Sequence, residues 1–127
     1  MKIKLSSVFV EDQEKALLFY TNILGFVKKN DMPAGQFRWL TVVSPDGPED
    51  MELLLEPNDN PAAKEYQGAL FEQGIPMNAF TVDDVEEEYK RLRALGVVFR
   101  SEPVKMEPTN IAMFEDTCGN IIQIYQV

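Results

Sequence analysis

A chain of 127 residues with a formal net charge of −9 has the length of one folded domain. Its composition, with 45% hydrophobic and 26% charged residues, is that of an ordinary globular protein and favours a folded chain over a disordered one. The acidic balance makes nucleic acid and anionic membranes poor partners, because phosphate groups are bound by lysine and arginine. A small cationic or neutral molecule is a better match.

The chain contains no histidine and a single cysteine, Cys118. Without histidine, a Ser-His-Asp triad and a two-histidine metal site are both excluded. One cysteine excludes an intramolecular disulfide and is typical of a reducing compartment. The first residues lack a signal peptide, and no apolar run is long enough to span a bilayer. We therefore expect a cytoplasmic protein with no membrane segment.

The first half of the chain predicts a strand, a helix and three further strands. Residues 3–11 alternate and are β-branched, as in a strand. Asp12 is a typical N-cap for a helix over 13–23, and Gly25 is a typical helix stop. Proline and glycine turns separate the next strands, which are predicted at 26–31, 37–44 and 51–56.

The second half repeats this pattern after a proline-bearing connector with a short helix. The predicted elements are a helix at 62–73, a strand at 76–82, a helix at 85–95 and strands at 97–100, 110–114 and 121–126. The caps Asp12 and Asp84 are 72 residues apart, and the stops Gly25 and Gly96 are 71 residues apart. These two offsets indicate an internal duplication.

The predicted fold class is therefore α+β, with two βαβββ modules in one domain over residues 1–127. The modules cover about 1–57 and 74–127, and the connector covers 58–73. Because each sheet has a helix on one face only, we expect a curved mixed sheet around a cleft, with the helices outside.

Several ordered motifs carry a resemblance to a known family. They are Val10-Glu11-Asp12, Phe19-Tyr20, Leu24-Gly25-Phe26, Phe80-Thr81-Val82-Asp83-Asp84, Leu95-Gly96-Val97 and Asp116-Thr117-Cys118-Gly119-Asn120. Over essentially the whole chain, this order resembles the vicinal oxygen chelate superfamily. Its members include glyoxalase I, extradiol dioxygenases, and fosfomycin and bleomycin resistance proteins. The resemblance implies a cleft for a small molecule and, as in other small members, a symmetric homodimer.

In metal-dependent members, the ligands lie on the first and last strands of each module. The resemblance carries these positions over to Leu5, Glu52, Met77 and Gln123. Only Glu52 is a good ligand for a hard divalent ion, since Gln123 is a weak neutral donor and Met77 a soft thioether. We therefore expect no bound metal and no cofactor.

The same resemblance, combined with strand alternation, supplies the residues that line the cleft. The ligand-binding candidates are Leu5, Ser7, Phe9, Arg38, Trp39, Glu52, Met77, Met113, Gln123 and Tyr125. Alternation turns Val8, Val10, Ile122 and Ile124 towards the helices. Trp39, the only tryptophan, is either a core residue or a ring that stacks on a ligand.

Glu52 is the candidate catalytic residue, with Arg38 on the preceding strand as its predicted partner. Its carboxylate points either into the cleft or into water at the strand edge. Burial in an apolar cleft would raise the pKa of Glu52 towards the range of a general base.

Two functions follow from these observations. The first is a metal-free small-molecule binding protein, like a bleomycin resistance protein, with an apolar cleft in an acidic chain. The second is a lyase, isomerase or dioxygenase-like enzyme that uses Glu52 as a general base without a metal. A metal-dependent version of that enzyme is a further alternative.

Overall fold

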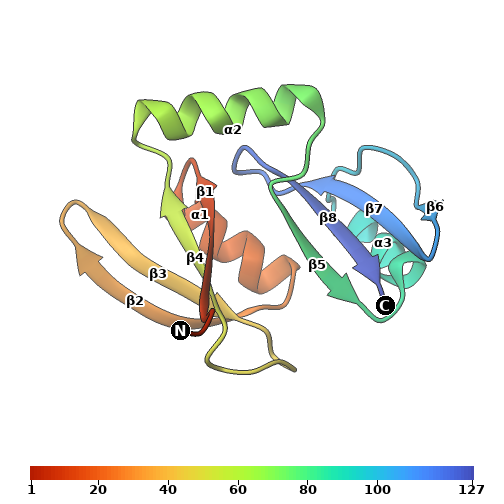
Figure 1. The fold of residues 1–127 in the computed structure, drawn as a ribbon, viewed down its shortest axis with the longest axis horizontal. Helices are drawn as coiled ribbons and strands as arrows, with labels where there is room; N and C mark the ends of the chain where they lie inside the picture. The colour runs from red at the N-terminus through yellow and green to blue at the C-terminus, as the bar shows by residue number, and fades with distance from the viewer. The chain divides into compact units, whose positions relative to one another are not determined.

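Eight strands and three α-helices make up the fold. The computed structural model describes residues 1–127, which form two units, 1–65 and 66–127 (Figure 1). Each unit has its own four-stranded mixed sheet, as expected for two modules. The predicted α+β class is confirmed. None of the helices combines the length and the apolar character that crossing a membrane requires.

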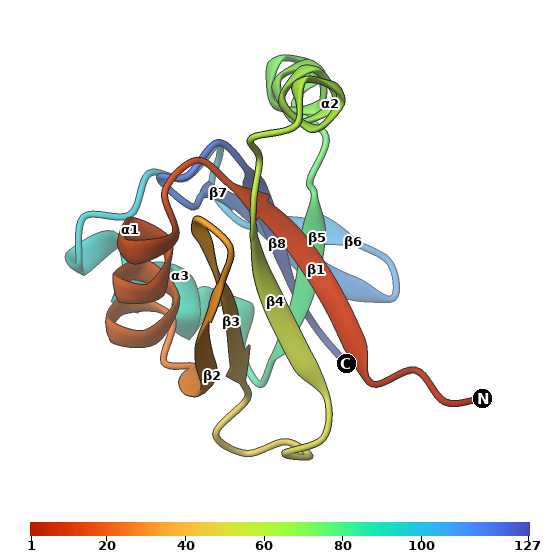
Figure 2. The same ribbon diagram turned by 90° about the vertical axis from the view of Figure 1, so that its left-hand side faces the viewer.

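Unit one, residues 1–65, contains the first four strands and α1. Its elements are β1 (Leu5–Val10), α1 (Gln13–Leu18), β2 (Val27–Ala34), β3 (Phe37–Val43), β4 (Glu52–Pro57) and the start of α2 (Pro61–Gln73). The strand order is β1-β4-β3-β2, with β1 parallel to β4 and the other pairs antiparallel. Helix α1 lies against one face of this sheet (Figure 2). We call the face turned away from α1 the open face of unit one.

Helix α1 begins where the sequence predicts. The side chain of Asp12 accepts a hydrogen bond of 3.0 Å from the backbone N–H of Lys15. The helix continues as a π-helical turn, Phe19–Ile23, and the chain leaves it at Gly25 with a φ of 91°. This left-handed conformation favours glycine, which has no Cβ to clash with the backbone. The predicted cap and stop are both confirmed.

The alternation of β1 separates the core from the open face. Val8 and Val10 are buried, with exposed fractions of 1% and 0%, while Leu5 and Ser7 are exposed. Packing β-branched side chains beneath α1 removes apolar surface from water, which is the main stabilising term of such a layer. The other buried residues of this unit include Ala16, Tyr20, Leu40, Val42, Leu53 and Leu55.

Unit two, residues 66–127, repeats the topology of unit one. It contains the rest of α2, β5 (Asn78–Val82), α3 (Val85–Ala94), β6 (Val104–Met106), β7 (Thr109–Glu115) and β8 (Ile121–Gln126). The strand order is β5-β8-β7-β6, with β5 parallel to β8. Asp84 caps α3 by accepting a hydrogen bond of 3.2 Å from the N–H of Glu87, and Gly96 follows with a φ of 89°. The matching order supports the predicted duplication.

The strand predicted at 97–100 is wrong. Only Phe99 makes a β-bridge there, opposite Phe114, and the strand that pairs with β7 is β6. Pro103 stands immediately before β6, and its ring nitrogen has no hydrogen to donate to a strand ladder. The pairing along β7 is therefore broken between Phe99 and Val104.

Candidate functional site

Glu52 lies on the open face of unit one, at the start of β4. Its register partner on the parallel strand β1 is Leu5. The side chain of Glu52 is 22% exposed, and Leu5 is 42% exposed. Unit one therefore brings together the two positions that the resemblance assigned to its ligand set, and they carry one carboxylate and one hydrocarbon side chain.

Two polar side chains hold one oxygen of Glu52. The hydroxyl of Thr41 on β3 and the amide Nδ2 of Asn30 on β2 each donate to Oε1 at 2.7 Å. The Thr41 oxygen accepts from the backbone N–H of Asn30 at 3.2 Å, so its own hydrogen is directed to Glu52. Thr41 is fully buried, which fixes the position of this donor. Neither Thr41 nor Asn30 was predicted from the sequence.

The other oxygen of Glu52 faces a lysine. Oε2 lies 4.0 Å from Nζ of Lys29, and the same Nζ donates to the backbone carbonyl of Glu49 at 2.5 Å. The hydrogen bond from Thr41 lowers the pKa of Glu52, partial burial opposes this, and the Asn30 hydrogen bond and the charge of Lys29 lower it further. The predicted rise of this pKa towards the range of a general base is wrong.

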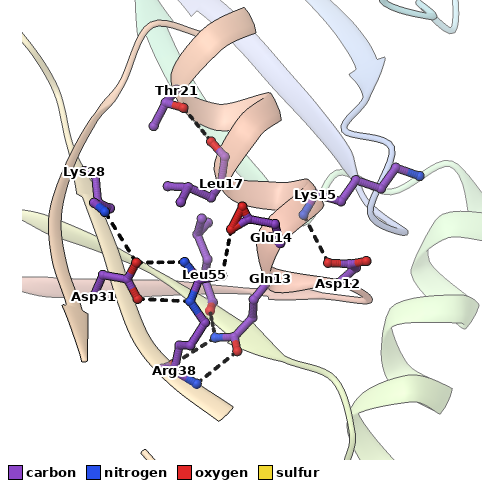
Figure 3. Close-up of polar contacts among 10 residues, drawn as sticks. All are labelled: Asp12, Gln13, Glu14, Lys15, Leu17, Thr21, Lys28, Asp31, Arg38 and Leu55. Carbon is purple, nitrogen blue, oxygen red and sulfur yellow. Dashed lines mark hydrogen bonds and ion pairs between the residues drawn. The ribbon is translucent and has the colours of Figure 1, made fainter. Parts of the chain in front are cut away.

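Arg38 lies on the opposite face of the sheet, on the side of α1. Its guanidinium donates to both oxygens of Asp31, at 3.0 and 2.7 Å, and to Glu14 at 3.0 Å (Figure 3). The bond from Arg38 lowers the pKa of Asp31 to about 2. The predicted pairing of Arg38 with Glu52 is wrong, because neighbouring residues of β3 point to opposite faces and Thr41 occupies the face of Glu52.

Gln13, the first residue of α1, ties this helix to two strands. Its Nε2 donates to the backbone carbonyls of Arg38 on β3 at 2.8 Å and of Leu55 on β4 at 2.9 Å. Its Oε1 accepts from the backbone N–H of Arg38 at 3.1 Å (Figure 3). The amide thus satisfies three backbone groups and fixes the helix face of the sheet. No local sequence pattern signals these long-range contacts.

Apolar side chains accompany Glu52 on the open face. Trp39 is 38% exposed and its register partner Met32 is 51% exposed, so Trp39 is not a core residue. Phe9 is half-buried and stands opposite Glu56. This face therefore offers a fixed carboxylate among exposed aromatic and aliphatic groups, and such a combination suits an amphipathic organic molecule.

In unit two, the structure groups three of the predicted site residues. Met113 on β7 and Gln123 on β8 are register partners, and Tyr125 lies two residues further along β8 on the same face. All three are half-buried. Met77 lies immediately before β5. Gln123 stands opposite Ala79, which is two residues after Met77. The pair Met77 and Gln123 is therefore staggered, whereas Leu5 and Glu52 are directly opposite.

A buried polar network stabilises the turn between β7 and β8. Asp116 accepts hydrogen bonds from the backbone N–H of Cys118 at 2.8 Å and from both nitrogens of Asn120, at 3.0 and 2.7 Å. Gln67 on α2 donates to Asn120 Oδ1 at 3.0 Å and to the Cys118 carbonyl at 3.1 Å. Cys118 is 1% exposed and lies within this turn. Gln67 was not identified from the sequence.

The donor atoms of the chain do not fit a catalytic divalent metal. Such an ion requires about three protein ligands with suitable donor atoms. In unit one, Glu52 faces a leucine, and its Oε1 already accepts two hydrogen bonds. In unit two, the corresponding positions carry a thioether and a neutral amide. No group of three or more Cys, Asp or Glu side chains is placed to hold a metal ion.

Comparison with known sequences gives one family and several full-length relatives. The sequence model of the Glyoxalase/Bleomycin resistance protein/Dioxygenase superfamily matches residues 2–124. The chain is 57% identical to the protein YurT of Bacillus subtilis (strain 168) over 126 residues, which are 99% of each chain. It is 27% identical to the lactoylglutathione lyase of Salmonella typhimurium over 99% of this chain and 93% of that protein.

Comparison with solved structures agrees with this family. UcmS2 is 32% identical, with a TM-score of 0.84 over 98% of this chain and 97% of its own. TnmS3 of Streptomyces sp. CB03234, described as an antibiotic binding protein, is 29% identical, with a TM-score of 0.74 over 99% of this chain and 95% of its own. The chain therefore belongs to the Glyoxalase/Bleomycin resistance protein/Dioxygenase superfamily.

Proposed function

We propose that the chain is a binding protein for a small organic molecule, with the ligand on the open face of unit one and no metal or cofactor. The observation that carries this proposal is the state of Glu52. Thr41 and Asn30 fix one oxygen of its carboxylate, and exposed Leu5 and Trp39 lie on the same face. Glu52 is the polar anchor, and the apolar side chains bind the hydrocarbon part of the ligand.

The similarity to TnmS3 supports binding, since that protein is described as an antibiotic binding protein and both chains are covered almost completely. The lowered pKa of Glu52 supports it as well. A carboxylate that stays ionised accepts hydrogen bonds well and takes up a proton poorly. This arrangement favours recognition of a ligand over proton abstraction.

A second candidate function is an enzyme that uses Glu52 as a general base. It is favoured by the 27% identity to a lactoylglutathione lyase over nearly the whole chain. The lowered pKa of Glu52 makes it a weak base, so we rank this function second. The enzymatic function would rank first if the protein turned over a carbonyl compound and Glu52→Gln abolished this turnover without loss of binding.

A thermal-shift screen tests the proposal. The protein, treated with a chelator, is screened against a library of metabolites and drugs, and calorimetry then measures the affinity of each compound that raises the melting temperature. We expect Glu52→Gln to weaken binding by about tenfold or more, because it removes the charge of the acceptor.

Glu56→Gln is the matched control, since Glu56 lies on the same strand and the same face as Glu52. It should leave the affinity within about threefold of the wild type. Binding that requires an added metal, or that both variants weaken equally, would contradict the proposal.

The remaining expectations from the sequence are part of this proposal and are still to be tested. They are ligand contacts from Ser7 and Phe9 in unit one and from Met77, Met113, Gln123 and Tyr125 in unit two, the symmetric homodimer and the cytoplasmic location. Light scattering at micromolar concentration tests the dimer directly. A monomeric mass would contradict it.

A further inference from the structure

The two oxygens of Glu52 differ in what they still accept. Oε1 receives two donors at 2.7 Å, from Thr41 and Asn30, which occupy its two lone pairs. Oε2 has no hydrogen-bond donor from the chain, and its only charged neighbour is Nζ of Lys29. Their separation of 4.0 Å is that of an ion pair and exceeds a hydrogen bond. Oε2 is therefore the acceptor that remains for a ligand.

Lys29 is held beside Oε2 by a second contact. Its Nζ donates to the backbone carbonyl of Glu49 at 2.5 Å, and its side chain is only 37% exposed. The ammonium is thus anchored on one side and faces the carboxylate on the other. A cation that approaches Oε2 meets this resident positive charge and must either displace it or bear its repulsion. A neutral N–H or O–H group meets no such repulsion.

The charge of this site differs from the charge of the whole chain. The net charge of −9 favours cations in general. At the site, however, one carboxylate stands beside one ammonium, so the local pair is neutral. At physiological salt, charges more than about 8–10 Å from Oε2 are largely screened. The ammonium of Lys29 therefore decides the charge selectivity at Oε2.

We propose that Lys29 sets the charge selectivity of the site, and that the ligand presents a neutral hydrogen-bond donor to Glu52 Oε2. The ligand class is an aromatic or aliphatic molecule with a hydroxyl or an amide N–H, and not an ammonium or amidinium compound. The apolar part lies against exposed Leu5 and Trp39. This inference rests on the proposed function, because it requires that Glu52 binds the ligand.

Benzyl alcohol and benzylammonium serve as probes, since they share one ring and differ in the charge of the donor. NMR titration measures their affinities for the wild type and for Lys29→Met, which removes the ammonium and keeps an apolar stem. We expect the wild type to bind benzyl alcohol more tightly. In Lys29→Met, the affinity for benzylammonium should rise by about tenfold, and the affinity for benzyl alcohol should change by less than about threefold.

Lys28→Met is the matched control. Lys28 is the neighbouring residue, but its ammonium pairs with Asp31 at 3.4 Å and not with Glu52. This variant should keep the preference of the wild type. Thermal unfolding of each variant verifies that it is folded.

Glu52→Gln separates failure of this inference from failure of the proposed function. If binding depends on Glu52 but the wild type prefers benzylammonium, or Lys29→Met leaves the preference unchanged, the inference is wrong and the proposed function stands. If Glu52→Gln leaves both affinities unchanged, or neither probe binds any variant up to its solubility, both are wrong.

Discussion

The hydroxyl of Thr41 on β3 donates a hydrogen bond of 2.7 Å to Oε1 of Glu52 on β4. Thr41 is fully buried, whereas Glu52 keeps 22% of its side chain exposed. A buried neutral donor thus holds a partly exposed acceptor in one orientation and stabilises its ionised form. This contact links the sheet of unit one to the chemistry of its open face.

Thr41→Val should raise the pKa of Glu52 towards its ordinary value, because it removes the largest cause of the lowered pKa. It should also lower the free energy of unfolding by about 1–2 kcal/mol, since the backbone N–H of Asn30 loses an acceptor as well. NMR titration of the Glu52 carboxyl carbon measures the pKa. Thr41→Ser keeps the hydroxyl and is the control, and an unchanged pKa in Thr41→Val would contradict the assignment.

Asp31 should make stability depend on pH at the acidic end. Its pKa is lowered from 3.8 to about 2 in the folded chain, mainly by the hydrogen bond from Arg38. Its stabilising contribution is therefore fully present above pH 3.8 and is lost as the pH falls through about 2. Asp31→Asn should destabilise the protein at neutral pH, and its difference from the wild type should shrink towards pH 2.

Urea unfolding at a series of pH values measures this dependence. Glu102→Gln, at an exposed position in the turn before β6, is the control and should show no such trend. A difference between Asp31→Asn and the wild type that stays constant from neutral pH to pH 2 would contradict the role of the Asp31–Arg38 pair.

Gln13→Ala should lower the free energy of unfolding by about 1–3 kcal/mol, because it leaves the carbonyls of Arg38 and Leu55 and the N–H of Arg38 without their partner. Chemical denaturation measures the change. Gln36→Ala, an exposed glutamine in the turn between β2 and β3, should cost less than about 0.5 kcal/mol. Equal losses in the two variants would show that the Gln13 amide does not stabilise the unit.

Asn120→Ala should destabilise unit two by about 1–3 kcal/mol, since Asp116 Oδ2 and Gln67 both lose a buried partner. Hydrogen exchange of the β7–β8 amides reports this loss locally. Asn22→Ala, at an exposed position, is the control. Unchanged protection in Asn120→Ala would mean that water satisfies these groups.

Local sequence signals predicted most of the fold. Asp12 and Asp84 begin helices because a short acidic side chain accepts from free N–H groups at a helix start. Gly25 and Gly96 end them in the left-handed region. The strand predicted at 97–100 is reduced to a single bridge at Phe99, and Pro103 interrupts the pairing before β6.

The candidate site was predicted less completely, because its contacts join residues far apart in the sequence. Alternation on β3 places Trp39 and Thr41 on one face and Arg38 on the other. This signal was sufficient to predict that Thr41, and not Arg38, shares the face of Trp39. Asn30 was harder to find. The register of β2 shifts between Lys28 and Asn30, and such a bulge changes the face on which the following residues lie.

Fluorescence of Trp39, the only tryptophan, measures whether a ligand binds through Glu52 without a metal. A compound from the screen is titrated into the wild type and into Glu52→Gln, each with and without excess chelator. We expect a saturable change in Trp39 emission that the chelator does not alter and that requires about tenfold or more ligand in Glu52→Gln. Equal affinities in the two proteins, or binding that the chelator abolishes, would contradict it.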